Sequence, residues 1–549
     1  MRILVSLAVL SSMALPLAAQ ERAVVDASQP TDISVTIYRD PDRSSDEEMN
    51  RNNPRGFAMI SETRRVTLPT GASTIRFEGV AEGMVGVSAI VTGLPGGTIE
   101  KNRNAELLSP AALVNGALGN RVTITRTNPA TGAEESEQAI VRTQANGGLV
   151  LQTSQGFEAV RCSGLPESMS FSHIPAGLSA KPVFSVDTNS PQGGTYEVTL
   201  TYISWGFDWQ ANYVATMQGS AGEEPAEGEF PLHLLSWLTL VNDNGQSFDN
   251  ARLQIIAGRL NVTSDFEDLA DPPYAAPLRL TCYPFGSTAA GSPVPSYEQW
   301  VPPPPPPPPM AMAPMGDDRI VVTASRVRRG ELESAAPVAV ITAEEENLGD
   351  LKLFRVPDRV DVSANGMKQV AFINKEDVEA RYLYRAACDP YDWIEDVDEP
   401  TAAGMLLVTK NEERKGLGIA LPQGALTLFE PTERGPMLAA TTDLRDYARG
   451  QDVELEIGQS AQVFVRCARL SEDRYDRDSR KWTDMRVELT NANPHPVKLR
   501  LQLGWSGDWD VRFPRNRVVV KDGYKVVELE IPANGTSEYR WRLRSSTAD

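Results

Sequence analysis

Apolar and polar residues alternate in many short stretches of the chain. In residues 195–202 the even positions carry Tyr, Val or Leu and the odd positions carry Thr or Glu, and the same period of two recurs at 453–457, 498–503, 527–531 and 539–543. Successive side chains of a strand point to opposite faces, so each stretch predicts a strand with one face on a core and the other in water. This pattern is typical of antiparallel sheets. We therefore predict an all-β fold of tandem antiparallel β-sandwich-like domains.

Turn signals and composition divide the predicted strands into domains. Asn-Gly and Asp-Gly pairs at 244–245, 522–523 and 534–535 indicate tight turns. The unbroken proline run at 302–309 is typical of a semi-rigid polyproline II spacer, although such a run can also dock in an aromatic groove. Helical periodicity is weak and favours one short helix, at 343–348. We expect a signal peptide at 1–19, an N-terminal β domain at 20–160, a β-sandwich with a Trp-containing strand at 161–300, a proline-rich linker segment at 301–347 and a C-terminal β-sandwich at 348–549.

The first residues indicate export. Arg2 precedes an apolar run at 3–10, and small residues lead to Ala19, which is the layout of a cleavable secretory signal peptide. A membrane anchor or a buried strand is the alternative, but the run is short for crossing a bilayer. No later apolar stretch approaches 18 residues, so we expect no transmembrane segment after cleavage. The expected location is the periplasm or cell envelope of a Gram-negative bacterium.

Composition and charge narrow the class of protein. The chain has 549 residues, 41% of them hydrophobic, which is ordinary for a globular protein and excludes a collagen-like or wholly disordered chain. Its formal net charge is −20. Nucleic acids and anionic lipids are bound by clusters of Lys and Arg, so neither is the expected main partner.

Cysteines suggest disulfide bonds. An even number in an exported chain predicts two bridges among Cys162, Cys282, Cys388 and Cys467, and three pairings remain open. We expect pairing within each half of the chain. Cys467 continues the inward register of Val463 and Val465, which indicates a structural bridge. Zinc binding is not expected, because no Cys-x-x-Cys spacing occurs and the three histidines are scattered.

Two tryptophan pairs follow predicted strands 300 residues apart: Trp205 with Trp209, and Trp505 with Trp509. Positions i and i+4 of a strand share a face, so the indoles of each pair could project together. They could then form a ligand platform for sugar rings or a peptide. The alternative, which we favour, is that they anchor the cores of two related sandwiches, because large aromatic side chains are mostly buried.

Catalytic and cofactor motifs are not evident. The chain shows no nucleophile elbow, zinc-protease helix, phosphate-binding loop or dinucleotide fingerprint, and we predict no cofactor and assign no catalytic or metal-binding residue. An acidic run at 389–399 offers oxygen ligands for Ca²⁺, but a solvated loop is the favoured interpretation. Aspartates and arginines interleaved at 473–480 are typical of a polar hairpin tip. Two carboxylates at glycosidase spacing cannot be recognised from sequence distance.

Residues 318–341, which run from Asp-Arg-Ile-Val-Val-Thr to Pro-Val-Ala-Val-Ile, are similar to the start of the plug domain of TonB-dependent receptors. Ala324 stands where that motif usually has Gly, and the rest of such a receptor has no room in the chain. The resemblance implies at most a periplasmic interaction element.

Several landmarks in preserved order resemble the bacterial family called domain of unknown function 4139, which is related to the mucoidy inhibitor A proteins. The match spans about residues 33 to 545 and includes segments at 107–113, 118–123, 147–151, 202–213, 238–245, 250–253, 352–356, 368–369, 417–418 and 421–424. A coiled-coil region common in that family is missing, and the insert at 302–341 is unusual for it. The family has no established activity, so the resemblance implies architecture and envelope location and carries over no functional residue.

Two functions follow as hypotheses. The preferred one is a non-catalytic envelope β-protein that binds another envelope component, either a protein or a glycan. The alternative is a carbohydrate-active hydrolase that uses paired carboxylates near the tryptophans. A hydrolase requires a cleft with facing carboxylates, at least one of which has a raised pKa.

Overall fold

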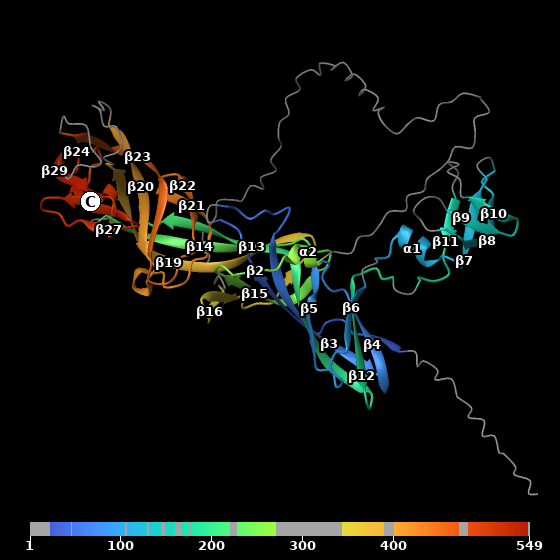
Figure 1. The fold of residues 1–549 in the computed structure, drawn as a ribbon. Helices are drawn as coiled ribbons and strands as arrows, with labels where there is room; N and C mark the ends of the chain where they lie inside the picture. Colours follow the sequence, from blue (N-terminus) through green and yellow to red (C-terminus); the bar gives the residue numbers. More distant parts are fainter. Residues whose placement is uncertain are drawn as a thin grey trace, which may run out of the picture. The chain divides into compact units, whose positions relative to one another are not determined.

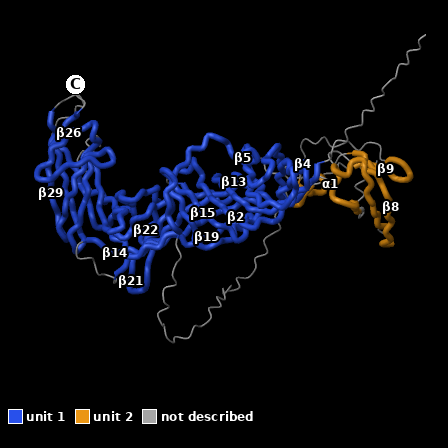
Figure 2. Tube along the Cα trace, turned by 90° about the horizontal axis from the view of Figure 1, so that it is seen from below, with its two compact units in different colours: residues 1–105, 181–273, 340–549 blue, residues 106–180, 274–339 orange. Residues whose placement is uncertain are grey.

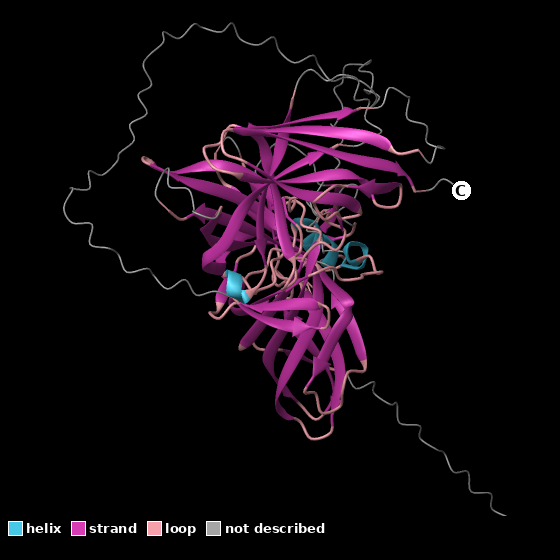
Figure 3. Ribbon diagram, turned by 90° about the vertical axis from the view of Figure 1, so that its left-hand side faces the viewer, coloured by secondary structure: helices cyan, strands magenta, loops and turns pink. Residues whose placement is uncertain are grey.

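Strands dominate the structure, which is a computed structural model (Figure 3). The prediction of an all-β fold is confirmed, since helices are confined to a few short segments of the described chain. The predicted signal peptide at 1–19, the proline run at 302–309 and the plug-like segment at 318–341 lie outside the described residues. The structure describes residues 22–44, 47–104, 107–128, 131–143, 149–159, 167–175, 178–219, 228–270, 343–388, 400–470 and 481–546.

The chain forms two compact units, which Figure 2 distinguishes by colour. Unit 1 contains residues 1–105, 181–273 and 340–549, and unit 2 contains residues 106–180 and 274–339. These bounds differ from the predicted division at 160, 300 and 347. The difference arises because strands on both sides of the predicted boundaries pair with each other, as described below.

Unit 2 is a small antiparallel sheet with one helix. Its strands follow the order β10, β9, β8, β7, β11. Ala111 and Val114 of the helix pack with Val122 and Leu151 of the sheet in one apolar cluster. Ser109 caps the helix through a 3.1 Å hydrogen bond from the Ala112 amide, and Pro110 occupies its first turn. Its elements are α1 (Pro110–Gly116), β7 (Arg121–Thr127), β8 (Glu134–Val141), β9 (Val150–Thr153), β10 (Gly156–Ala159) and β11 (Glu167–Ser170).

Unit 1 begins with a four-stranded sheet and a set of longer strands. The small sheet has the order β1, β4, β12, β6, and β1 runs parallel to β4. The elements of this part are β1 (Ala23–Asp26), β2 (Asp32–Tyr38), β3 (Gly56–Leu68), β4 (Gly71–Glu78), β5 (Met84–Thr92), β6 (Glu100–Asn104), β12 (Val183–Ser190), β13 (Gly194–Met217), β14 (Glu229–Asn242), β15 (Phe248–Ala257) and α2 (Phe266–Ala270).

The remaining strands of unit 1 come from the second half of the chain. They are β16 (Glu344–Leu348), β17 (Leu351–Arg355), β18 (Val360–Val362), β19 (Gly366–Ala387), β20 (Thr401–Lys410), the 3-10 turn η1 (Glu413–Lys415), β21 (Gly424–Thr432), β22 (Gly435–Leu444), β23 (Asp452–Arg469), β24 (Thr483–Asn491), β25 (Val497–Trp505), β26 (Trp509–Arg512), β27 (Val519–Lys521), β28 (Tyr524–Ile531) and β29 (Gly535–Ser545).

The central core of unit 1 combines both halves of the chain. Strand β13 is 24 residues long and pairs with β3 along its first part and with β14 along its second part (Figure 1). It also pairs in parallel with β21, and β14 pairs with β19. One cluster of buried side chains therefore extends from Val35 to Leu455. A first-half sandwich separate from a second-half sandwich is thus not what the structure contains, because non-local strand pairing joins the two halves.

A second core lies among the C-terminal strands. It is built from β24, β25, β28 and β29 together with the ends of β19, β20 and β23. Trp509, Trp541 and Leu501 are among its fully buried side chains. Strands β19, β20 and β23 contribute to the central core and to the C-terminal core. These three strands therefore connect the two cores without a linker.

The predicted short helix at 343–348 is wrong, because that segment is strand β16. It pairs antiparallel with β17, from Glu344 opposite Arg355 to Leu348 opposite Leu351. Gly349 has a positive φ of 61° and allows the tight turn between the two strands. Pairing with the neighbouring strand β17 stabilises a strand here, and this outweighs the weak helical pattern of the sequence.

A disulfide bond joins Cys388 and Cys467, so the expected pairing within the second half is confirmed. The two Cα atoms are 5.8 Å apart, and Cys388 lies in the C-terminal core. Cys467 also packs against this core beside Val463 and Val465, as its register predicted. Cys162 and Cys282 lie outside the described residues.

Replacing Cys388 and Cys467 together by Ala should lower the free energy of unfolding by about 2–4 kcal/mol, because the bridge closes a long loop in the unfolded chain. Urea unfolding of the double variant measures the loss, and the wild type under reducing conditions should show the same loss. Alkylation of both cysteines in the unreduced, urea-unfolded protein would contradict the bridge.

Candidate functional site

A groove of about 590 Å³ lies on one face of the sheet that joins the two cores. Six strands lie side by side there in the order β23, β20, β19, β25, β28, β27. Odd-numbered residues of β25 and β28, such as Leu501 and Val527, face the C-terminal core, so Arg500 and Val526 face the groove. The groove is lined by Arg385, Leu406, Arg445, Tyr447, Gln451, Asp452, Glu454, Glu456, Arg500, Gln502, Lys521, Asp522 and Val526.

Ion pairs cross the groove between strands that are distant in sequence. Arg385 and Arg500 occupy paired register positions on β19 and β25, so two positive charges are neighbours. Glu454 and Glu456 are two residues apart on β23 and share a face. Arg500 donates a 2.7 Å hydrogen bond to Glu454, and Arg385 donates one of 2.7 Å to Glu456. The carboxylates of one strand thus compensate the guanidinium groups of two others.

Glu454 is the centre of this network, because it also accepts a hydrogen bond from Lys521. Burial by itself raises the pKa of the Glu454 carboxyl, but the hydrogen bonds from Arg500 and Lys521 outweigh burial and leave that pKa below its usual range. For Arg500, burial by itself lowers the pKa, and the hydrogen bonds to Glu454 and Glu528 outweigh it. Glu454 is therefore an ionised, paired carboxylate and a poor general acid.

Two arginines of the groove have donors without an acceptor among the described residues. The Arg500 side chain is 8% exposed, and its Nε is buried without a hydrogen-bond partner among the described residues. Arg445 stacks on Tyr447, with its guanidinium carbon 4.5 Å from the ring centroid, and no ion pair of Arg445 occurs in the described part of the chain. An unpaired buried donor is unfavourable unless a ligand or water satisfies it.

The structure separates the indoles of each tryptophan pair, so the prediction that they share a face is wrong. Trp209 and Trp509 are buried in the two cores, whereas Trp205 is partly exposed and Trp505 is 48% exposed. The pairing of β13 with β3 shifts between Trp205 and Phe207, at Gly206 with its φ of 86°. A turn after β25 separates Trp505 from Trp509. A platform of all four indoles is therefore not formed, and only Trp205 and Trp505 present surface.

Trp205 lines a smaller groove of about 160 Å³, and this groove contains the carboxylates expected of the hydrolase alternative. Its residues are Asp40, Pro41, Asp42, Arg55, Phe57, Trp205, Val262, Ser264, Asp265, Phe266 and Glu267. The carboxyls whose pKa is raised lie elsewhere. Burial raises the pKa of Asp208, which is enclosed by Arg43, and burial followed by the charge of Glu82 raises the pKa of Asp243.

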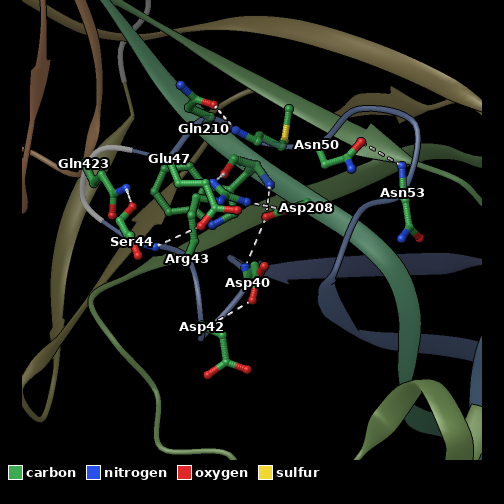
Figure 4. Close-up of polar contacts among 12 residues, drawn as sticks. Asp40, Asp42, Arg43, Ser44, Glu47, Asn50, Asn53, Asp208, Gln210 and Gln423 are labelled. Carbon is green, nitrogen blue, oxygen red and sulfur yellow. Dashed lines mark hydrogen bonds and ion pairs between the residues drawn. The ribbon is translucent and has the colours of Figure 1, made fainter.

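Polar contacts fasten the loop that follows β2 to strand β13 (Figure 4). Asp208 forms a buried ion pair with Arg43, and its Oδ1 accepts hydrogen bonds from the amides of Asp40 at 3.2 Å and Trp209 at 2.8 Å. The Met49 amide donates to Gln210 at 2.7 Å. Both carboxylate oxygens of Asp208 therefore contact the loop after β2 or strand β13 itself. We conclude that this cluster is structural.

A further groove of about 620 Å³ is lined by Phe513, Trp541 and three arginines of the C-terminal strands. Its rim includes Leu470, which directly precedes a stretch outside the described residues, and we assign it no role. The acidic run at 389–399 and the charged stretch at 473–480 also lie outside the described residues.

No family model matches the chain, and no curated protein matches it. Among the described helices, none is both long enough and apolar enough to cross a bilayer.

Sequence reasoning placed Glu454, Glu456 and Arg500 on the solvated faces of predicted strands and gave them no role. Arg500 is only 6% exposed, so this part of the alternation was misleading. One signal was available in the sequence. Opposite charges occupy the polar positions of alternating strands, and these strands belong to the same sheet in the structure.

Glu454→Gln should lower the free energy of unfolding at pH 7 by about 1–3 kcal/mol, because it leaves Arg500 and Lys521 without their shared counter-charge. The native pKa of Glu454 is below its unfolded value, so its contribution is present above about pH 4.3 and is lost as the pH falls through the native pKa. Urea unfolding from pH 7 to 3 should show the two proteins converging in acid. Glu538→Gln, at an exposed pair with Arg540, is the control and should change little. A constant difference at all pH values would argue against this role.

Asp208→Asn should destabilise the protein by about 3–5 kcal/mol, because Arg43 then stays buried without a counter-charge. The measurement is the urea unfolding free energy. Asp26→Asn removes an exposed partner of Arg76 and should cost less than about 1 kcal/mol. Equal effects of the two substitutions would show that the Asp208 pair does not hold the loop.

Proposed function

We propose that this chain is an exported, non-catalytic binding protein of the bacterial cell envelope, and that the charged groove receives its ligand. The observation that carries the proposal is the guanidinium of Arg445, which lines the groove, stacks on Tyr447 and forms no ion pair with any described residue. Bound ligands commonly satisfy such groups, and the groove volume is in the range of small-molecule sites.

The state of the groove carboxylates supports binding over catalysis. Acid–base hydrolysis of a glycoside needs one carboxylic acid with a raised pKa beside a second carboxylate. In the groove, Glu454 has a lowered pKa and is held by Arg500 and Lys521. The raised carboxyl of Asp208 is enclosed by Arg43 and does not line the groove. Fixed ion pairs of this kind can orient a polar ligand, but they do not exchange protons near neutral pH.

Export is supported by two observations. Arg2 and the apolar run at 3–10 have the layout of a signal peptide. The bridge between Cys388 and Cys467 is typical of oxidising compartments, such as the periplasm. We also retain as a proposal the resemblance to the domain of unknown function 4139 family, which adds an expected envelope location and no activity.

The hydrolase alternative has one supporting observation, which is the groove that combines Trp205 with Asp40, Asp42, Asp265 and Glu267. A hydrolase would release new reducing ends from the polysaccharides of the envelope fraction. We expect none. Reducing ends that disappear in an Asp42→Asn or Asp265→Asn variant would favour the alternative.

Crosslinking in living cells tests the binding function. The tagged full-length protein, purified from the envelope fraction, should carry a specific crosslinked protein or glycan. The Arg445→Glu variant should not carry it. This substitution reverses the charge of the one groove cation that has no ion pair in the described chain. Arg434→Glu changes an exposed arginine at the turn after β21 and is the matched control.

The same recovery from the wild type and Arg445→Glu would contradict a role for the groove. If the component is instead lost on deleting 302–341, the linker and plug-like segment make the contact, and the groove proposal is wrong.

A further inference from the structure

We infer that the ligand of the charged groove is a saccharide that carries a carboxylate, and that one of its sugar rings stacks on Trp505. This inference rests on the proposed function and deepens it by naming the ligand class. It is carried by two groups that differ in burial and in chemistry, Arg445 and Trp505.

The carboxylate is indicated by one unpaired cation. Lys521, Arg385 and Arg500 are paired with Glu454, Glu456 and Glu528, which leaves the guanidinium of Arg445 without an ion pair among the described residues. The face of the Arg445 guanidinium is occupied by Tyr447, so its in-plane N–H groups remain for a ligand. Charge-assisted hydrogen bonds from arginine select a carboxylate over a hydroxyl.

The sugar ring is indicated by the exposed indole beside the groove. Trp505 lies on Gly523, where an added Cβ would come within 2.2 Å of the ring, and Gly523 directly follows the groove residue Asp522. Tyr524 meets the indole edge-on, with 5.2 Å between the ring centroids. The indole is thus fixed by contacts with Gly523 and Tyr524, and 48% of Trp505 remains exposed. A rigid, partly exposed aromatic face suits the apolar face of a pyranose ring.

A saccharide fits better than a polyanion. Backbone groups of the inner strands pair with each other, so hydrogen bonds to a ligand on this sheet face come from side chains such as Gln502 and Asp522. Side-chain amides and carboxylates match sugar hydroxyls. The formal net charge of −20 opposes a polymer with many negative charges.

Calorimetric titration of the full-length protein with cellobiouronic acid and cellobiose tests the inference, because the two disaccharides differ only by one carboxylate. The wild type should bind the acid about tenfold more tightly, as expected for one charge-assisted contact. Arg445→Gln should remove that difference, because it weakens binding of the acid more than binding of cellobiose. Trp505→Ala should weaken both sugars by about tenfold or less, and Trp505→Tyr should restore part of the loss. Urea midpoints identify any variant that fails to fold.

Arg434→Gln and Trp237→Ala are matched controls, since Trp237 is 38% exposed on β14 and does not line the groove. Equal affinity of the wild type for both sugars would overturn the carboxylate, and an unchanged Trp505→Ala variant would overturn the stacking. Absence of binding to either sugar at millimolar concentration would overturn the ligand class, while a crosslinked partner that depends on Arg445 would still support the proposed function. Cleavage of the disaccharides would overturn the proposed function itself.

Discussion

The structure of unit 1 depends on three strands that belong to two cores. β19, β20 and β23 bury one face in the central core and, further along, the same face in the C-terminal core. In β23 this is visible as Val453 and Leu455 at one end and Val463 and Val465 at the other. Because every second side chain must be apolar where a strand faces a core, the opposite face is where polar residues can be placed. The charged groove is that opposite face at the junction between the cores.

The junction requires charge compensation. The parallel pairing of β19 with β25 brings Arg385 next to Arg500, and Arg500 is almost fully buried. Two neighbouring cations are unfavourable in a partly buried setting unless carboxylates face them. Glu454 and Glu456 supply these carboxylates from β23. The same network fixes the positions of the lining side chains. The ligand that we propose for the groove would therefore lose less entropy on binding.

Backbone irregularities decide which aromatic residues are available at the surface. A regular strand would place Trp205 and Trp209 on one face, but the register shift at Gly206 sends Trp209 into the central core. In the C-terminal core Gly504 has a φ of 122°, and an added Cβ would meet the Trp509 ring at 2.5 Å. The chain then turns before Trp509, which leaves Trp505 outside. Each pair is therefore divided into a buried core residue and a partly exposed one.

The sequence by itself determined the all-β fold, the presence of β23, β25, β28 and β29 and the inward register of Cys467, because these follow from local alternation and turn residues. Only the tertiary structure decided the helix at Pro110–Gly116, strand β16, the union of both halves in one core and the burial of Arg500. The physical reason is that a period of two reports which side chains share a face, whereas the identity of the neighbouring strand depends on pairings hundreds of residues apart. The residues that line the groove come from strands that such pairings bring together. For that reason no local pattern in the chain indicated the groove.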